Sequence, residues 1–313
     1  MDAKELHEPW LVAAWPGMGA VGLLAASTLA KLLGAEGLGE LDTTRYFDVR
    51  QLEVENGLFQ PATHPRTLLF AWKAPPGGRD LLVLLGEAQP GAEAWSYARA
   101  VVGVARDLGV QRVVTFAAMG APIDPRAEHR VFAAASDAAL LEEARRSGLP
   151  TLQEGEVSGL NGVLIGAAAE SGIAGLCLLG EFPYFASAVP NPRASAAVLK
   201  AFGELAGVAV DAAELETQAA EIEDELVTLG EELEAAAKRR HIPGFPLEAD
   251  DEPEPEEVAE LDVDHATRVR LEAMFDQARA DRDKALELKA ELDRLGLFRE
   301  YEDRFLDLFR KAG

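Results

Sequence analysis

The feature that most constrains the fold is an alternation between short, continuous apolar runs and stretches with helical spacing, from residue 10 to about residue 209. Continuous apolar runs are typical of strands covered on both faces of a sheet. The expected strands are residues 10–15, 52–58, 67–72, 81–85, 112–118, 131–135 and 173–179. The expected helices are residues 20–33, 92–108, 137–147, 161–170 and 193–205. This pattern predicts an α/β domain with a mainly parallel central sheet and helices on both faces.

One segment breaks the alternation. Residues 45–51, 52–58 and 67–72 follow one another without an intervening helix, and the turn-forming pair Asn56-Gly57 and a proline-containing stretch at 61–65 lie among them. We therefore expect a hairpin or a small antiparallel extension of the sheet here.

After residue 210 the chain changes character. Apolar residues recur in steps of four and three, which is a seven-residue repeat, at Leu215, Ala219, Ile222, Leu226, Leu229, Leu233 and Ala236. We expect a long amphipathic helix over residues 211–240, an acidic proline-rich linker over 241–264, and a helical segment over 265–313. A second stripe in that last segment comprises Leu271, Phe275, Ala278, Arg282, Ala285, Leu288, Leu292 and Leu295.

The sequence does not decide what the two apolar stripes pack against. They can pair with each other as an antiparallel helical hairpin, pack on the α/β domain (residues 1–210), or pack on another copy of the chain. Narrow seams of this kind suit coiled-coil contacts, so intramolecular packing and partner binding both remain possible.

Charge and composition limit the partners. The net charge is -24, of which residues 1–210 carry -7 and residues 211–313 carry -17. Such a chain repels phosphate backbones and anionic membrane surfaces, so we expect no nucleic acid or membrane partner.

The single cysteine, Cys177, excludes a disulfide framework and a multi-thiolate metal site. Because the chain has neither a signal-peptide core in its first nine residues nor an apolar run of about 18 residues, we expect a cytoplasmic protein.

A glycine turn directly follows the first expected strand. Gly17, Gly19 and Gly22 have the G-x-G-x-x-G spacing and open a helix, and Asp42 lies about twenty residues further on. Such a turn can hold the pyrophosphate of a dinucleotide. However, residues 37–42 are too short and too glycine-broken to be the second strand of that site. We therefore expect the glycines to serve backbone geometry, and we expect no cofactor.

Four motifs in fixed order carry a family resemblance. They are the turn at residues 15–22, the glycine-rich helix start at 158–166, the apolar run 173–179 with its following Gly180-Glu181, and the proline-led helix at 190–199. This set, which spans residues 11–233, resembles the PAC2 family (proteasome-assembly-chaperone-2-like). The resemblance implies a fold similar to purine nucleoside phosphorylases, homo- or hetero-oligomers, and help in assembling proteasomes by binding their subunits.

The carboxyl terminus departs from one pattern of that family. Some archaeal relatives end in a hydrophobic-Tyr-any tripeptide that docks on the proteasome. This chain ends in Arg310-Lys311-Ala312-Gly313, so the resemblance does not carry that docking mode over.

Catalytic groupings are scarce. The sequence has neither a serine in a G-x-S-x-G elbow nor an H-E-x-x-H motif, and its five histidines are scattered, so we predict no catalytic residue and no metal site. The densest polar cluster is residues 124–130, which contains Asp124, Arg126, Glu128, His129 and Arg130. It could supply an acid–base pair with an anion-holding arginine, but a solvated, self-compensating loop is the favoured interpretation.

A candidate ligand pocket is predicted at the carboxyl edge of the sheet. Glu181 stands at the end of an expected buried strand, where open α/β sheets place ligand crevices. Asn161 is expected to cap a helix near Ser158. The residues that could line one pocket with the glycine turn are Gly17, Met18, Gly19, Ser158, Asn161 and Glu181. A polar edge without function is the competing interpretation.

Two functional hypotheses follow. The first is a non-catalytic, protein-binding scaffold of the assembly-chaperone type, a homo-oligomer whose C-terminal helices engage a client or a neighbouring copy. It expects that deletion of residues 241–313 leaves a folded core but abolishes partner capture. The second is a nucleoside- or phosphate-ligand-binding protein or enzyme that uses the pocket at the sheet edge.

Overall fold

The computed structural model describes residues 6–48, 52, 54–240, 271, 274, 275, 284, 288 and 292. The chain divides into two compact units, residues 1–249 and 250–313. In the second unit, Leu271, Phe275, Leu288 and Leu292 are helical and buried. These four belong to the second apolar stripe. The predicted linker, 241–264, and the remainder of the segment 265–313 lie outside the described residues.

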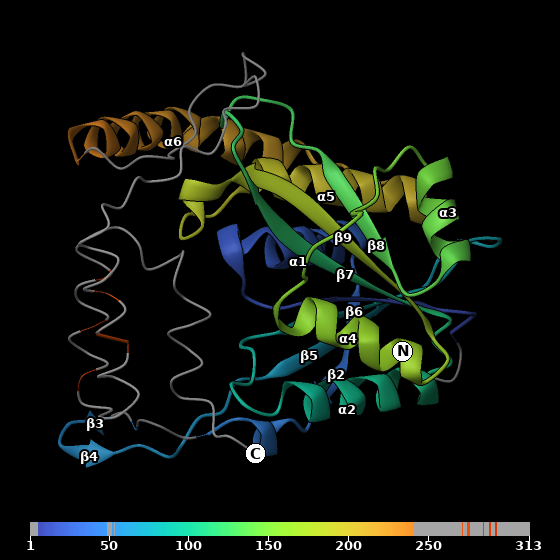
Figure 1. The fold of residues 1–313 in the computed structure, drawn as a ribbon. Coiled ribbons are helices and arrows are strands. Elements are labelled where there is room, and N and C mark those ends of the chain that lie inside the picture. Colours follow the sequence, from blue (N-terminus) through green and yellow to red (C-terminus); the bar gives the residue numbers. More distant parts are fainter. Residues whose placement is uncertain are drawn as a thin grey trace. The chain divides into compact units, whose positions relative to one another are not determined.

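A seven-stranded sheet forms the centre of the first unit, in the order β2-β5-β6-β1-β7-β9-β8 (Figure 1). The strands of this sheet are β1 (Trp10–Ala14), β2 (Glu36–Leu41), β5 (Thr67–Trp72), β6 (Leu81–Gly86), β7 (Arg112–Ala121), β8 (Val131–Ala135) and β9 (Ala174–Pro183). The four central strands β6, β1, β7 and β9 are parallel, whereas β5, β2 and β8 are antiparallel to their neighbours. The predicted α/β class is confirmed, with the parallel strands at the centre of the sheet.

Helices cover both faces, as expected (Figure 1). They are α1 (Val21–Leu33), α2 (Ala94–Asp107), α3 (Ala138–Arg146), α4 (Gly159–Glu170), α5 (Pro192–Ala206) and α6 (Ala213–Arg240). Residues of α1, α3 and α5 join one core cluster with one set of strand side chains, and residues of α2 and α4 join the other. The second face is therefore covered by α2 and α4.

Strand β1 shows why the apolar runs are continuous. Val12 and Ala14 face the α1 and α5 side, while Leu11, Ala13 and Trp15 face the α2 and α4 side, and all five are buried. Successive side chains of a strand point to opposite faces, so a strand covered on both sides needs apolar residues at every position. Burial of each large side chain contributes about 1.5–3 kcal/mol.

Two helices begin at side chains that cap them. Asp137 accepts a hydrogen bond from Leu140 N (2.9 Å) at the start of α3, and Asn191 accepts one from Ala194 N (3.0 Å) at the start of α5. Such caps satisfy backbone donors that have no partner within the helix, and each contributes about 1 kcal/mol.

One strand was missing from the expected set. Residues 37–42 were judged too short and glycine-broken to be the second strand of a dinucleotide site, yet Glu36–Leu41 forms β2 and pairs with β5, with a register shift between Gly37 and Gly39. An edge strand pairs on one side only, so it tolerates glycine and a bulge. Since β2 is antiparallel and lies at the edge, it is not the second parallel strand that a dinucleotide site requires.

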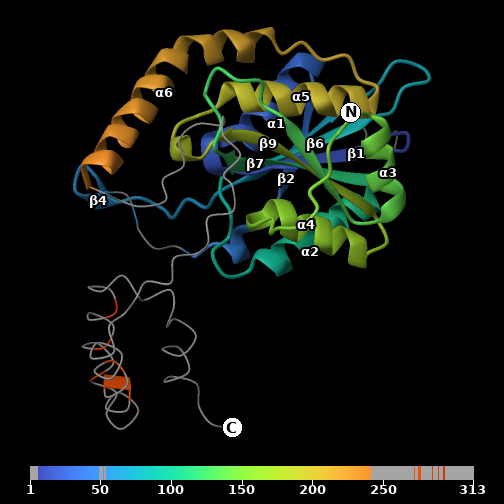
Figure 2. The same cartoon turned by 45° about the horizontal axis from the view of Figure 1, so that its top comes forward.

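The expected antiparallel extension is present, but residues 52–58 are not one strand. Val54–Glu55 (β3) pairs with Leu58–Phe59 (β4) around a turn at Asn56 and Gly57, both of which have positive φ. This is the favoured geometry for a two-residue hairpin turn. The β3–β4 hairpin forms a separate two-stranded sheet and stands away from the main sheet (Figures 1 and 2).

Helix α6 packs along α5 through its first half. Leu215, Ala219 and Leu226 are buried, and Ile222 joins the same core cluster. Lys31 of α1 forms an ion pair with Glu214 (2.8 Å), which fixes the start of α6. Among the described residues, no helix is both long enough and apolar enough to cross a membrane.

The approach of α1 to β7 gives a stability prediction. A Cβ atom at Gly22 would lie 2.3 Å from the carbonyl oxygen of Phe116, so Gly22→Ala forces α1 away from the sheet. We expect a loss of about 2–4 kcal/mol in the free energy of unfolding, measured by urea denaturation.

Gly103→Ala is the matched control. Gly103 lies within α2, and a Cβ there meets no atom within 4 Å. Alanine is the better helix former, so this variant should gain up to about 1 kcal/mol. Equal stability of the two variants would contradict the close approach.

Candidate functional site

The glycine turn after β1 uses its own backbone donors. Gly19 N donates to Ser187 O (2.8 Å), Ala20 N donates to Gly17 O (3.0 Å), and Val21 N donates to Met18 O. An anion site at a helix start needs free N–H groups that point at the ligand. In this turn, three successive amides are already bound within the protein.

Gly19 couples the turn to the start of α5. It has a φ of 58°, which favours glycine, and its carbonyl oxygen accepts a hydrogen bond from Asn191 N (2.7 Å). A Cβ at Gly19 would lie 3.3 Å from the Cβ of Asn191. The turn is therefore packed against the segment that caps α5, while the side chain of Met18 is exposed.

Gln89 joins the glycine turn to the start of α4. Its Nε2 donates to Pro16 O (2.7 Å), and its Oε1 accepts from Leu160 N (2.9 Å). Sequence reasoning missed this residue, because a single glutamine in a loop carries no motif. The bridge brings the predicted pocket residues of the turn close to those at the start of α4.

Asn161 does not cap α4, contrary to expectation. Ser158 is the N-cap residue, without a side-chain capping bond, and Asn161 lies inside the first turn of the helix. The Asn161 carbonyl oxygen accepts from the Thr115 hydroxyl (3.0 Å), and its side-chain Oδ1 is buried with no hydrogen-bond partner among the described residues. The cap fails because the helix begins at Gly159, two residues earlier than predicted.

Glu181 is held by an arginine. It lies in β9, three per cent exposed, and its carboxylate accepts two hydrogen bonds of 2.8 Å from the guanidinium of Arg130. Strand β7 lies between β9 and β1, so Glu181 and the glycine turn are on opposite sides of that strand. A carboxylate in a two-point ion pair has its charge compensated within the protein.

His129 is the second buried polar side chain at this end of the sheet. It is five per cent exposed, and neither ring nitrogen has a hydrogen-bond partner within the part of the chain that the structure describes. Burial lowers the pKa of His129 below its ordinary value of 6.5, and the positive charge of Arg193 lowers this pKa further. The neutral imidazole is therefore favoured in the folded protein.

The charged residues of the polar cluster at 124–130 are exposed, as expected, but the arginines find their partners outside the loop. Arg126 forms ion pairs with Glu223 (3.3 Å) and Asp224 (2.7 Å) of α6, and Arg130 binds Glu181 of β9. Asp124 accepts from the backbone N of Arg126 (2.6 Å) and so closes a local turn. Sequence alone could not show this, because the partners are 51 to 98 residues away. The cluster connects α6 and β9.

Two hollows of the surface lie away from the predicted pocket. One, of about 750 Å³, lies between β2 and α2 and is lined by Leu38, Leu41 and Val104 among others. The other lies on α6, along residues 228–235. Neither hollow is lined by any of the six residues predicted from the sequence, which therefore stay a prediction.

The β3–β4 hairpin presents apolar side chains to solvent. The exposed fractions are 58% for Val54, 69% for Leu58 and 75% for Phe59, and the neighbouring Leu52 is also exposed. Contiguous exposed apolar residues on a folded protein mark interaction surfaces. The sequence signal for this surface was present: the turn Asn56-Gly57 carries apolar residues on both sides with no covering helix.

Comparison with known proteins identifies the family. The profile described as the PAC2 family matches residues 11–229, which is more than half of the chain. The chain belongs to the PAC2 family. The predicted resemblance is thereby confirmed, and its extent agrees with the four motifs between residues 11 and 233.

Several relatives share the fold. "Uncharacterized protein MJ1210" of Methanocaldococcus jannaschii is 26% identical over 222 residues, which cover 70% of this chain and 81% of that protein. Pyrococcus furiosus PbaB, an archaeal proteasome activator, superposes with a TM-score of 0.61 at 25% identity, over 72% of this chain and 95% of PbaB. The Mycobacterium tuberculosis proteasome-assembly chaperone homologue Rv2125 gives a TM-score of 0.59 at 25% identity, over 70% of this chain and 94% of Rv2125.

The buried His129 gives the PAC2 protein a pH dependence. Above pH 6.5 the imidazole is neutral in the folded and unfolded states, but below it only the unfolded state readily takes up the proton. We expect the free energy of unfolding to fall between pH 7.5 and 5.5, by up to about 1.4 kcal/mol per pH unit. Urea denaturation at several pH values measures the slope.

His129→Leu removes the proton uptake and keeps the site apolar, so its slope over this range should be flatter than that of the parent protein. Parallel slopes for the two proteins would show that His129 does not carry the effect.

Proposed function

We propose that this PAC2 protein is a non-catalytic, protein-binding scaffold that holds a client on the β3–β4 hairpin. The observation that carries the proposal is the exposure of Val54, Leu58 and Phe59 on both strands of a two-stranded ribbon. Apolar residues at such exposure are unfavourable in water unless a partner covers them for part of the time.

The engagement of the polar groups at the sheet edge supports the same proposal. Three amides of the glycine turn, the carboxylate of Glu181 and the guanidinium of Arg126 are all bound within the protein. A catalytic carboxylate or an anion cradle needs a free group that points at a substrate. These groups instead hold the glycine turn, β9 and α6 in place.

Relatives indicate the class of client. PbaB is an archaeal proteasome activator, and Rv2125 is a proteasome-assembly chaperone homologue. A scaffold for proteasome assembly binds unassembled subunits, whose future contact surfaces are exposed and apolar. We therefore propose proteasome subunits as the client class, and the hairpin supplies a complementary apolar surface.

One observation favours the ligand-binding alternative. The Oδ1 atom of Asn161 is buried without a hydrogen-bond partner among the described residues, beside the bridge that Gln89 makes to the glycine turn. A buried polar atom of this kind normally finds a partner, which can be a ligand or a water molecule. A ligand that binds beside Asn161 would supply this missing partner.

Leu58→Ser/Phe59→Ser should weaken client binding by at least about tenfold, because apolar anchors at the centre of an interface each contribute more than about 1 kcal/mol. Both residues are mostly exposed, so the thermal stability should stay unchanged. The measurement is the affinity of the full chain for purified proteasome subunits of the source organism.

Leu32→Ser is the matched control, since Leu32 is 40% exposed and lies on α1. It should bind subunits as the parent protein does. Subunit binding that survives the double substitution, or no subunit binding by the parent protein, would contradict the proposal.

A thermal-shift screen with nucleosides, nucleotides and phosphate tests the alternative. A ligand at about a hundredfold excess over its dissociation constant stabilises a protein by roughly 2.7 kcal/mol. We expect no shift of the melting temperature with any of these compounds. A reproducible shift that Asn161→Ala abolishes would replace the scaffold by the ligand-binding function.

A further inference from the structure

Strand β2 and helix α2 leave a hollow between them. β2 is an edge strand of the sheet, and α2 packs beside it on the face that α2 and α4 cover (Figure 1). The hollow has a volume of about 750 Å³. Its apolar lining consists of Leu38, Leu41, Leu69, Ala100, Val104 and Leu108. Small-molecule sites in proteins have this size and a mainly apolar lining of this kind.

Small residues keep this hollow open. Gly39 of β2 lines it, and a Cβ atom at Gly39 would meet no atom within 4 Å. Ala100 of α2 contributes only a methyl group to the opposite wall. Leu38 and Leu41 are half-buried, so the hollow is a part of the apolar core that the described side chains leave unfilled.

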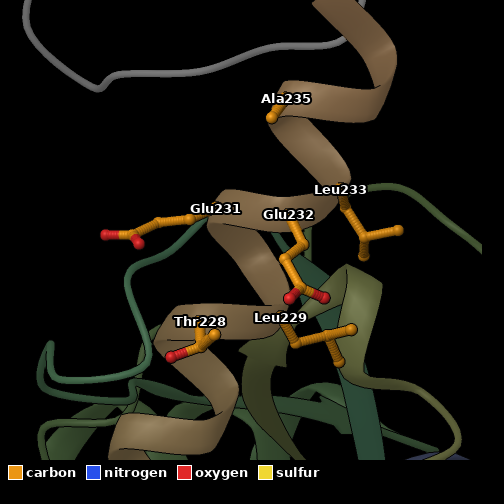
Figure 3. Close-up of a pocket in the computed structure, with 6 residues that line it drawn as sticks. All are labelled: Thr228, Leu229, Glu231, Glu232, Leu233 and Ala235. Carbon is orange, nitrogen blue, oxygen red and sulfur yellow. The ribbon is translucent and has the colours of Figure 1, made fainter.

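The hollow on α6 differs, because it has a single wall. All of its lining residues belong to α6, and Leu229 and Leu233 point to one side of the helix while Glu231 points to another (Figure 3). Such a surface does not surround a ligand, whereas the hollow at β2 has walls from a strand and a helix. The hollow at β2 is therefore the better candidate for a ligand site.

A buried chain of hydrogen bonds ends at the hollow. The indole N–H of Trp15 donates to the Tyr97 hydroxyl (3.0 Å), which is bonded to the Thr67 hydroxyl (2.7 Å). The Thr67 hydroxyl is bonded in turn to that of Thr43 (3.1 Å). Thr43 is three per cent exposed and lines the hollow. Its side chain makes no capping bond to the short helix η3 (Thr44–Tyr46) that follows it.

The direction of this chain follows from its hydrogens. Three hydroxyl groups carry three hydrogens, but only two hydroxyl–hydroxyl bonds are available to them. Burial raises the pKa of Tyr97 above its ordinary value of 10, so the phenol keeps its hydrogen at neutral pH. Because Tyr97 and Thr67 are fully buried, Tyr97 donates to Thr67, and Thr67 donates to Thr43. The Thr43 hydrogen is left without an acceptor among the described residues, at the wall of the hollow.

We propose that the hollow between β2 and α2 binds a small apolar molecule that carries a carbonyl group and no negative charge. The apolar body lies against the leucine and valine side chains, and the carbonyl oxygen accepts the hydrogen of the Thr43 hydroxyl. Glu40 and Asp42 line the same hollow and are exposed. Hydrogen bonds from Thr44 lower the pKa of Asp42 below its ordinary value of 3.8, so the rim is negative at neutral pH and disfavours anions.

An extended peptide fits this edge less well than a small molecule does. Such a peptide would pair with the open side of β2, but the register shift between Gly37 and Gly39 and the charges of Glu36 and Glu40 hinder strand pairing there. The hollow is lined by no residue of the β3–β4 hairpin, so the site is independent of client binding. The two proposals fail or succeed separately.

Nile red is a suitable probe, because it is an uncharged aromatic molecule with a carbonyl oxygen and it fluoresces strongly in apolar surroundings. A fluorescence titration of the full chain should show saturable binding. Ala100→Phe fills the hollow and should weaken this binding at least about tenfold. Ala169→Phe is the matched control, since Ala169 is exposed on α4 and does not line the hollow. It should bind Nile red as the parent protein does.

Thr43→Val tests the hydrogen bond, because valine has nearly the same shape but no hydroxyl group. It should lower the affinity for Nile red about threefold to tenfold. The affinity for phenylnaphthylamine, an apolar probe without a carbonyl group, should stay unchanged. Thr43→Val also removes the acceptor of the Thr67 hydroxyl, but a loss of stability from that cause would act on both probes alike. Thr43→Ser keeps the hydroxyl group and should bind Nile red nearly as the parent does.

A third variant tests the acidic rim. Glu40→Gln/Asp42→Asn should raise the affinity for anilinonaphthalene sulfonate, an anionic probe, and leave the affinity for Nile red unchanged. Equal affinities of the parent protein and this variant for the anionic probe would show that the rim does not select against negative charge.

Three further results would overturn the proposal. The parent chain could show no saturable binding of Nile red. Ala100→Phe could bind as the parent does, or Leu58→Ser/Phe59→Ser could abolish binding, and the probe would then lie outside the hollow. Thr43→Val could leave the affinity for Nile red unchanged or weaken both probes equally, which would show that the Thr43 hydroxyl does not bind the carbonyl group.

Discussion

The structure depends on the close approach of α1 to β7. Gly22 brings the helix so near to Phe116 that no side chain fits between them, and Gly19 accepts the backbone hydrogen bond that begins α5. The turn between β1 and α1 is therefore a point where two helices and the central strands are fixed together. Gly19 and Gly22 are explained by this geometry, and three amide donors of the turn are bound within the protein. A close-packed interior leaves little freedom to move such a turn.

Because the glycine turn is tightly packed, we look for the binding surface of the PAC2 protein elsewhere on the domain. The charged residues near the carboxyl edge hold neighbouring elements together: Arg130 binds Glu181, and Arg126 binds α6. The apolar β3–β4 hairpin stays open to solvent and is built from local sequence. We propose that it binds a client.

Much of the fold was predictable from the sequence, because its signals are local. The continuous apolar run of β1 and the start of α3 at residue 137 are signalled directly by the local sequence. The edge strand β2 was missed because its pairing with β5 overrides the low strand propensity of its glycines. The candidate site was less predictable. The bridge made by Gln89 and the ion pairs of Arg126 join residues 71 to 98 positions apart, and a single sequence carries no signal for such pairs.

Amide hydrogen exchange at residues 17–22 tests whether the backbone of the glycine turn is closed by its own hydrogen bonds. We expect the amides of Gly19, Ala20 and Val21 to exchange slowly in the free protein, and we expect phosphate or nucleotides to leave their exchange rates unchanged. Rapid exchange of these amides in the free protein, slowed by such a ligand, would contradict it and show that the turn is an anion cradle.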